Sequence, residues 1–415
     1  VDPVRTQTAA AADIHLPLRP GSDAALAFAM AAAMRAAGHF DRDWIAAHVL
    51  GAEELDPLLD ACTPEWGEAQ TGVAAADIVA AAQAFGPGPS MLWAGQALSR
   101  QPRGGNAMRA VGMLAPLTGN VGRPGAGMYY LNFTPAIAGL DVDWLFGADL
   151  LQRERAAVPW GRVAEALAGP QYRMFFCWNT NPLGSAPRQG RLREALARED
   201  LFSVVVDCFH TDTTAMADYV LPAASFLEAD DITFSYFNLL IGAQRRVCDP
   251  PGEALPNAEI FRRLAAAAGL DEPALHEPQE ALLEAMCRQM GIAGGFDALA
   301  RDGWTWIDPE TQQFWADGQF PTPSGRVEIA SAAAAADGHP RLPEPHADPA
   351  PGAGRLRLLS PASYYRVNGS YANDAGLARR AGPAAVHLAP ADAAALAIAE
   401  GDRVRLANDT AVLEL

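Results

Sequence analysis

Apolar residues along the chain fall into two patterns, a helical spacing and short uninterrupted runs. Helical patterns cover 24–34, 42–50, 73–85, 106–117, 189–197, 257–268 and 279–290. Short runs at 90–94, 173–178, 202–207 and 218–221 have the length of buried parallel strands. A strand followed by a turn and a helix recurs along the chain. This alternation is typical of doubly wound α/β domains, and we expect two of them.

The expected organisation is two α/β domains, a linker and a small β domain. We place the α/β domains at 1–134 and 135–331. Residues 332–354 are rich in Ala and Pro and are predicted to be the linker. Short strand patterns at 355–360, 385–388 and 402–408, interrupted by Gly and Pro, predict the start of a β-barrel over 355–415.

Composition narrows the class of protein. Half of the 415 residues are hydrophobic and 19% are charged, which excludes collagen-like, disordered and small disulfide-framework proteins. Every basic residue is Arg, and the net charge of −18 argues against nucleic acid or an anionic membrane as the main partner. No apolar run approaches the roughly 18 to 20 residues of a membrane helix, so we expect no membrane insertion by this chain.

Several familiar chemistries have no motif in this sequence. The five Cys lie far apart without a C-x-x-C pair, so neither a zinc site nor an iron–sulfur cluster is predicted within these residues. There is no H-E-x-x-H and no G-x-S-x-G, which argues against metal-dependent and triad hydrolases. A nicotinamide dehydrogenase stays an alternative, although the G-x-G-x-x-G that it needs is absent.

Polar residues that follow apolar strands are the first candidates for a site. Asp2, Asn179 with Asn181, and Asp207 each stand just past such a strand. In open α/β sheets, ligands bind outside the carboxyl ends of the strands. A carboxylate there can accept two hydrogen bonds at once, from a guanine or from two ribose hydroxyls. Each residue alone could equally be a turn former or a helix cap, but together they favour a nucleotide.

A glycine turn gives the second candidate. Gly95 follows a predicted strand and precedes a helix, and Arg100 and Arg103 lie nearby. Backbone N–H groups at such a turn can meet a phosphate at the helix N-terminus. His210, beside Asp207, is interpreted as a structural, hydrogen-bonded histidine. The residues alone indicate an α/β protein that holds a nucleotide-like anion, and they name no reaction.

A series of motifs occurs in a fixed order along nearly the whole chain. It comprises Asp2-Pro3-x-Arg5-Thr6, Arg19-Pro-Gly-Ser-Asp23, Leu117-Thr-Gly-Asn-Val-Gly-x-Pro-Gly-x-Gly127, Asn179-x-Asn181-Pro182, Asp212-Thr-x-x-x-Ala217-Asp218, Pro323-Ser-Gly-x-Val-Glu328 and Asn368-Gly-Ser-x-x-Asn373. As an ordered set, these motifs resemble the large catalytic subunit of the molybdopterin oxidoreductases, the dimethyl sulfoxide reductase family. The resemblance implies two doubly wound α/β domains followed by part of a double-psi-type β-barrel.

The resemblance also implies a cofactor and residues that hold it. The family binds molybdenum, or tungsten, with two molybdopterin guanine dinucleotides, and it transfers two electrons or an oxygen atom. One guanosine is expected at Asp2, Pro3, Arg5, Gly21 and Asp23, with the adjoining phosphates at Gly95 and Arg100. The second cofactor is expected at Asn179, Asn181, Asp207 and Asn257, and the last domain would close over the pterins with Ser363, Asn368, Ser370 and Asn373.

Some expected parts of the family lie outside this sequence. The chain opens on Val1 without Met and closes on a strand-like run, so we expect it to be part of a longer protein. By resemblance, the metal ligand and a 4Fe–4S cluster lie upstream of Val1. No residue here is therefore named as catalytic or as a metal ligand, and we expect this part alone to be inactive. Two departures from the family pattern are Ser99, where Gln is common, and Asn257, where Asp is common.

The stretch from Glu228 to Tyr236 resembles the thiosulfate, polysulfide and dimethyl sulfoxide reductase branch more than formate dehydrogenases or nitrate reductases. The expected partners are a small-molecule substrate and an iron–sulfur electron-transfer subunit. We expect the cytoplasm, with export to the periplasm by a twin-arginine leader as the alternative. A second hypothesis is an electron-transfer or structural subunit that keeps the fold and has lost the pterin. The retained Asp2, Asp23, Asp207 and Asn373 argue against it.

Overall fold

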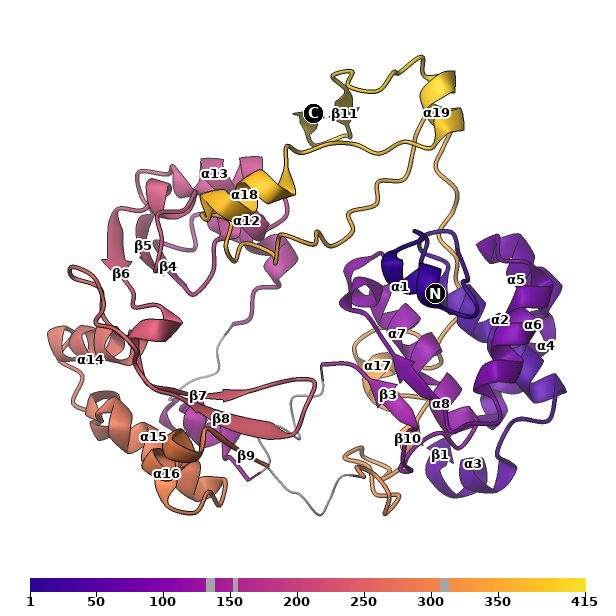
Figure 1. Cartoon of the computed structure of the whole chain (residues 1–415), viewed down its shortest axis with the longest axis horizontal. Helices are drawn as coiled ribbons and strands as arrows, with labels where there is room; N and C mark the ends of the chain where they lie inside the picture. Colours follow the sequence, from indigo (N-terminus) through magenta and orange to yellow (C-terminus); the bar gives the residue numbers. More distant parts are fainter. Residues whose placement is uncertain (132–138, 152–155, 307–312) are drawn as a thin grey trace. The chain divides into compact units, whose positions relative to one another are not determined.

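The computed structural model describes residues 1–131, 139–151, 156–306 and 313–415. The chain divides into two compact units, and most of their elements are labelled in Figure 1. Unit 1 comprises Val1–Ala138, Phe234–Leu240 and Trp306–Leu359. Unit 2 comprises Gly139–Thr233, Ile241–Thr305 and Ser360–Leu415. Among the described residues, no helix is both long enough and apolar enough to cross a membrane.

Unit 1 is built around one buried helix, α2 (Asp23–Ala36), which is labelled in Figure 1. Its Phe28 and Met34 side chains are completely buried, and most of its other residues are Ala. Small side chains let neighbouring helices approach closely: a Cβ added at Gly67 would lie 2.5 Å from the Cβ of Ala29. The helices around α2 are α4 (Asp56–Ala61), α5 (Pro64–Thr71), α6 (Ala75–Phe85), α7 (Gly104–Gly112) and α8 (Leu114–Leu117). The unit also contains α1 (Gln7–Ala11) and α3 (Arg42–His48).

Two short parallel pairs complete unit 1. Strand β2 (Met91–Trp93) pairs with β3 (Gly127–Tyr129), and β1 (Val49–Leu50) pairs with β10 (Val327–Glu328). The predicted parallel strand at 90–94 is therefore confirmed. Its expected burial is wrong, because Met91 is 51% exposed and Trp93 is 64% exposed. Met91 and Trp93 lie on the same face of this two-stranded sheet, which the described residues cover only in part, through ring contacts of Trp93 with Tyr129 and Phe237.

Unit 2 contains a parallel sheet with the strand order β4–β5–β6. The strands are β4 (Met174–Trp178), β5 (Phe202–Asp207) and β6 (Tyr219–Pro222), each within one residue of its prediction. On one face, Phe175 packs against the core of α11 (Val163–Ala168) and α13 (Gln189–Leu196). On the other face, Ile260 of α14 (Asn257–Ala267) packs with Val206. This arrangement confirms the predicted doubly wound pattern.

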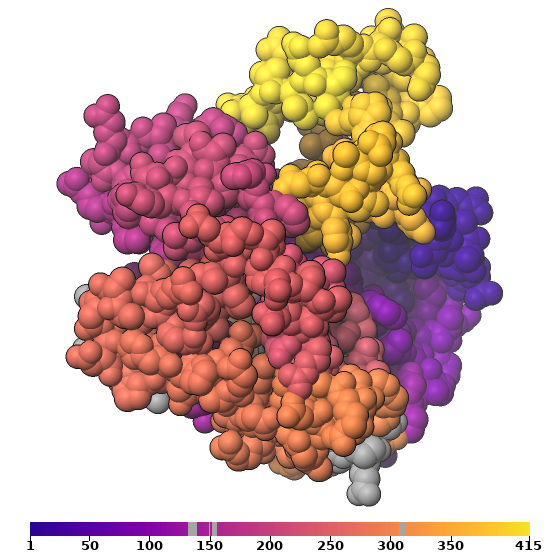
Figure 2. All heavy atoms as spheres, turned by 60° about the vertical axis from the view of Figure 1, so that its left-hand side comes forward, coloured from indigo at the N-terminus to yellow at the C-terminus, as the bar shows by residue number. Residues whose placement is uncertain are grey.

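Unit 2 contains further helices and most residues of a second sheet, whose Phe234, Leu240 and Trp306 belong to unit 1. Strands β7 (Asp231–Phe234), β8 (Leu240–Gln244) and β9 (Trp304–Trp306) form a second sheet in that order. Helices α15 (Gln279–Gln289) and α16 (Gly295–Asp302) contact each other, and the salmon-to-orange surface in Figure 2 contains them with α14. Short helices α10 (Val142–Leu145) and α12 (Pro182–Ser185) complete this part.

The segment expected to be a linker contacts unit 1 through specific side chains. It begins with α17 (Ala332–Ala336), and further on Arg109 donates to the Pro340 carbonyl at 2.6 Å. Arg103 forms an ion pair with Glu344 at 3.2 Å. The domain limits given above stay predictions, and the limit after 134 falls outside the described residues.

The last part of the chain contains few regular elements. These are α18 (Ala375–Ala381), α19 (Pro390–Ala395) and the antiparallel pair β11 (Arg405–Ala407) and β12 (Val412–Glu414). The strand predicted over 402–408 is confirmed in part, whereas those at 355–360 and 385–388 are wrong. Among the described residues, neither segment has the neighbouring strand that an extended run needs. The barrel expected over 355–415 stays a prediction.

Two buried thiols give a direct test of this packing. Burial raises the pKa of Cys62 and of Cys177 to about 11, and for Cys177 the Asp207 carboxylate adds to the effect. At pH 8 about one in a thousand of these thiols is therefore ionised. We expect iodoacetamide at pH 8 to leave Cys62 and Cys177 of the folded protein unlabelled while exposed Cys248 reacts, as measured by peptide mass spectrometry. Equal labelling of all three would contradict the described cores.

Candidate functional site

The parallel sheet of unit 2 brings three predicted site residues to one edge. Trp178 of β4 pairs with Val206 of β5, so the next residues, Asn179 and Asp207, lie side by side at the ends of neighbouring strands. Beyond β6, Ala224 N–H donates to the Leu255 carbonyl at 2.8 Å, and Leu255 N–H donates to the Pro222 carbonyl at 3.1 Å. Asn257 stands two residues further on, at the first position of α14. These residues therefore lie at the edge of the sheet where ligands bind in open parallel sheets.

Polar atoms at this edge have unused hydrogen-bonding capacity. The Asn257 Oδ1 atom is buried and accepts no hydrogen bond from the described residues. The Asp207 Oδ1 atom accepts from the Phe209 N–H at 3.0 Å, and no described residue donates to its second oxygen. Leaving a buried acceptor unpaired costs about 1–3 kcal/mol, so such atoms are uncommon and point to a missing partner. Asn179 has a left-handed backbone with φ 58°, which Asn tolerates better than most residues.

Asn181 and Asn373 tie loops together at the same edge. The Thr213 hydroxyl donates to Asn181 Oδ1 at 2.6 Å, which joins the loops that follow β4 and β5. The Asn373 amide donates to the His210 carbonyl at 3.4 Å. Residues Ser363, Asn368 and Ser370 are exposed in turns, and their side chains make no hydrogen bond to the strand ends within the described residues. Their expected role in covering the pterins stays a prediction.

In unit 1 the glycine turn is connected to the start of α2. Asp23 is the first residue of α2, and the Gln101 amide donates to its Oδ2 atom at 2.9 Å. Between Gly95 and Gln101 the chain forms a short 3-10 helix (Gln96–Arg100), in which Arg100 donates to Gln96 Oε1 at 3.0 Å. A Cβ added at Gly95 would contact nothing within 4 Å, so its backbone is open. The predicted residues Gly95, Arg100 and Asp23 thus belong to one connected surface.

The first residues of the chain reach the same unit. Asp2 N–H donates to the Leu16 carbonyl at 3.3 Å, and His15 Nε2 donates to the Asp2 carbonyl at 2.8 Å. The Asp2 carboxylate accepts from the Val4 N–H at 2.8 Å, while Pro3 and Arg5 are exposed beside it. Asp2 is therefore attached to the segment that leads to Gly21 and Asp23.

Asp348 is a site neighbour that sequence reasoning missed. Its N–H donates to the Gly21 carbonyl at 2.9 Å, and a Cβ added at Gly21 would lie 2.4 Å from its Oδ2 atom. The carboxylate is 6% exposed and accepts from Arg357 at 2.8 Å and from His346 at 3.1 Å. Burial acts to raise the pKa of Asp348, but the hydrogen bonds and charges of Arg357 and His346 outweigh it and hold the pKa below its ordinary value. Neither Asp348 nor Gln101 stands in a motif that marks it.

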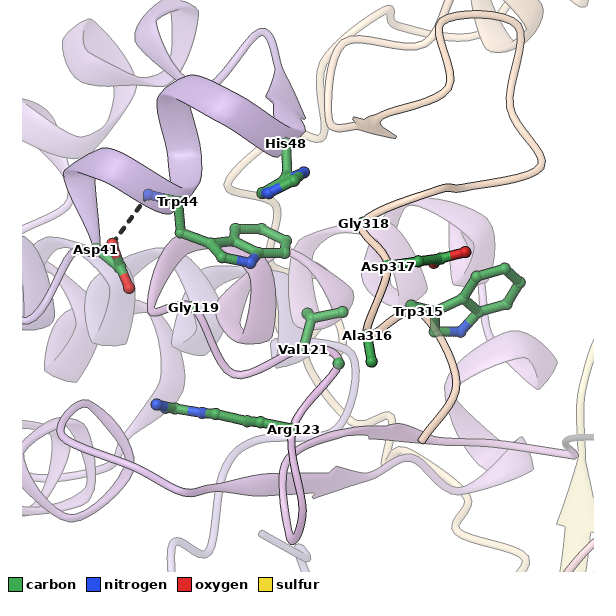
Figure 3. Close-up of a pocket in the computed structure, with 11 residues that line it drawn as sticks. Asp41, Trp44, His48, Gly119, Val121, Arg123, Trp315, Ala316, Asp317 and Gly318 are labelled. Atoms are coloured by element: carbon green, nitrogen blue, oxygen red, sulfur yellow. Dashed lines mark hydrogen bonds between the residues drawn. The ribbon is translucent and has the colours of Figure 1, made fainter. Parts of the chain in front are cut away.

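A separate cavity of about 320 Å³ lies in unit 1 (Figure 3). Asp41, Trp44 and His48 line one side, and residues 119, 121–123 and 315–318 line the rest. The Asp41 carboxylate accepts from the Trp44 N–H at 3.0 Å and so caps α3, as the dashed line in Figure 3 shows. None of the residues predicted to bind the cofactor lines this cavity.

Comparison with known proteins identifies the family. A family model described as molybdopterin oxidoreductase matches residues 1–267, and the model of the molybdopterin dinucleotide binding domain matches residues 356–415. The chain belongs to the molybdopterin oxidoreductase family. The α/β part of its predicted fold class is confirmed by the structure of acetylene hydratase from Pelobacter acetylenicus, with a TM-score of 0.77 and 22% sequence identity. That match covers 100% of this chain and 63% of the hydratase.

Curated relatives agree with the family assignment. The chain is 31% identical to the probable oxidoreductase YoaE of Bacillus subtilis over 351 residues, which is 83% of this chain and 51% of YoaE. It is 29% identical to the dimethyl sulfoxide/trimethylamine N-oxide reductase of Rhodobacter capsulatus, over 99% of this chain and 58% of the reductase. It is 30% identical to the F420-dependent formate dehydrogenase 1 subunit alpha of Methanococcus maripaludis, over 74% of this chain and 48% of that subunit. The chain therefore spans about half the length of the curated relatives that it matches.

The polar residues at the edge of the unit 2 sheet fit the nucleotide part of a molybdopterin dinucleotide. A nucleotide base and ribose carry N–H and O–H donors, and the second Asp207 oxygen and the buried Oδ1 of Asn257 are acceptors without partners among the described residues. In unit 1, the open backbone at Gly95 and the nearby Arg100 suit phosphate. The individual binding roles stay predictions.

The pairing of Asp348 with Arg357 and His346 predicts that the stability of the folded protein depends on pH. The folded pKa of Asp348 lies below the ordinary carboxyl value of about 3.9. The stability that ionised Asp348 contributes to the fold is therefore complete above about pH 3.9 and is lost as the pH falls through the folded pKa. We expect Asp348→Asn to destabilise the protein by about 2 kcal/mol at pH 7. The difference in melting temperature from the unsubstituted protein should shrink towards pH 3. Exposed Asp337→Asn, from the same segment, is the control. A difference that stays constant with pH would contradict the assigned pairing.

Proposed function

We propose that the whole protein, of which this chain is a part, is a molybdenum- or tungsten-dependent oxidoreductase with two molybdopterin guanine dinucleotides. The observation that carries the proposal is the sheet edge of unit 2, where Asp207 and the unpaired buried Oδ1 of Asn257 lie at parallel strand ends. In a member of this family, that edge supports dinucleotide binding rather than a purely structural role.

The chain's own residues would bind and orient the cofactor. Asp207 and Asn257 would accept hydrogen bonds from one guanosine, and Asn181 would hold the two adjoining loops in place through Thr213. Asp23, oriented by Gln101, would accept from the other guanosine, with Arg100 neutralising phosphate charge. When bound, the cofactor supplies a metal centre that exchanges two electrons with a substrate.

For the substrate we propose a small oxidised sulfur or nitrogen compound that gives up an oxygen atom. Two observations support this choice. Relatives named dimethyl sulfoxide/trimethylamine N-oxide reductases match 99% of this chain, whereas the formate dehydrogenases match 56–74% of it. The stretch from Glu228 to Tyr236 also departs from the form common in formate dehydrogenases.

We further propose that an iron–sulfur subunit exchanges electrons with the whole protein, and that a 4Fe–4S cluster lies in another part of it. Support comes from the formate dehydrogenase relatives, which are named as alpha subunits. An electron-transfer subunit without pterin is the alternative outcome of the experiments below.

Asp207 gives the most direct test of cofactor binding. In the full-length protein, produced with molybdate, Asp207→Ala removes an acceptor at the sheet edge and should lower bound dinucleotide at least severalfold. The measurement is the amount of GMP released per polypeptide by acid hydrolysis. Glu194→Ala, an exposed carboxylate on α13, is the matched control and should leave the yield unchanged. No GMP from the unsubstituted protein would overturn the proposal and favour the pterin-free subunit.

Asn257 predicts opposite effects with and without the cofactor. In cofactor-free protein, Asn257→Ala removes an unpaired buried acceptor, so the melting temperature should stay equal or rise. In loaded protein the same change removes a cofactor contact, so the extra stability that the cofactor gives should fall. A lower melting temperature in the cofactor-free protein would show that Asn257 is a structural residue instead.

A further inference from the structure

Trp178 is a large aromatic residue that the described structure leaves open at the proposed cofactor site of unit 2. It is the last residue of β4, immediately before Asn179, and its side chain is 48% exposed. Its strand neighbour Cys177 is buried on the opposite face of the sheet. An indole with this exposure at the carboxyl end of a parallel strand faces the region where ligands of such sheets bind.

Helix α14 contacts the indole and covers only part of it. Ile260 packs with Val206, which pairs with Trp178 in the parallel sheet and lies on the same face. The next residue, Phe261, forms a T-shaped pair with the Trp178 ring, with centroids 5.0 Å apart and an interplanar angle of 79°. A T-shaped neighbour limits the orientations of a ring, and the 48% exposure of Trp178 shows how much of its surface the described residues leave open. Phe261 also contacts Phe176, with ring centroids 5.9 Å apart, so α14 packs on β4 as well as β5 and still leaves Trp178 half exposed.

The same helix places an unpaired acceptor beside the indole. Asn257 and Phe261 are four residues apart on α14 and therefore share one face of that helix. Since Phe261 contacts Trp178, the buried and unpaired Oδ1 of Asn257 lies on the side of α14 that faces the indole. A flat aromatic surface next to a hydrogen-bond acceptor is the combination that recognises a nucleobase, which has a π-face and N–H donors at its edge.

We propose that the indole of Trp178, which forms a T-shaped pair with Phe261, is the surface on which the purine base of the dinucleotide stacks in unit 2. The inference rests on the proposed function and adds to it a residue that no family motif in this chain contains. Trp178 is a positioning residue for the cofactor: it contributes affinity for the base and does not take part in electron transfer.

The test uses the full-length protein produced without cofactor and GDP as the probe, with inorganic pyrophosphate as a second probe that lacks the base. Trp178→Ala should weaken one of the two GDP sites about tenfold or more, because stacking on an aromatic side chain contributes roughly that factor per base. Trp178→Phe should recover most of the affinity, since it keeps a π-face. Pyrophosphate affinity should be the same in all variants. Trp160→Ala, which removes another 48% exposed tryptophan of unit 2, is the matched control.

The outcomes separate this inference from the proposed function. GDP binding that is unchanged by Trp178→Ala, or reduced equally by Trp160→Ala, would overturn the stacking role and leave the proposed function intact. A loss of melting temperature in Trp178→Ala with unchanged GDP affinity would show that the indole packs on another part of the protein. An unsubstituted protein that binds no GDP would overturn both the stacking role and the proposed function.

Discussion

The parallel register of β4, β5 and β6 is the constraint on which the proposed site of unit 2 depends. It places the ends of β4 and β5 side by side, so that Asn179 and Asp207 are neighbours although 28 positions separate them in the sequence. The pairing of Ala223 with Leu255 continues this edge and brings Asn257 to it. A shift of one residue in the β4–β5 pairing would turn Trp178 to the opposite face of the sheet, away from Phe261 and Asn257 of α14.

In unit 1 a helix, rather than a parallel sheet, positions the predicted site residues. Its centre is an Ala-rich helix rather than a broad sheet, and Asp23 stands at the start of that helix. The Gln101 side chain, which immediately follows Arg100, holds the Asp23 carboxylate. Since Ser99 replaces the Gln that is common in the family, Gln101 offers an amide two positions later in the same turn. Asp348 adds a second, buried carboxylate beside Gly21, and no sequence motif marks it.

Local patterns predicted much of this fold, and long-range contacts account for what they missed. The run Ser203-Val-Val-Val206 indicates a buried strand on its own, and the rule for parallel sheets then predicts a site at Asp207. The burial of 90–94 could not be predicted, because it depends on whether another layer covers β2. Asp348 lies in an Ala- and Pro-rich stretch that reads as a linker, and its partner Gly21 is more than 300 residues away in the sequence. The exposure of Trp178 likewise depends on how α14 packs on the sheet.

The central claim is that the carboxyl edge of the unit 2 sheet binds a guanine nucleotide as part of a molybdopterin cofactor. The most direct measurement is a structure of the full-length, cofactor-loaded protein by crystallography or electron cryomicroscopy. We expect density for guanosine next to Asp207 at the end of β5 and Asn257 at the start of α14. A loaded protein whose nucleotide density lies away from this edge, with Asn257 Oδ1 still unpaired, would contradict it.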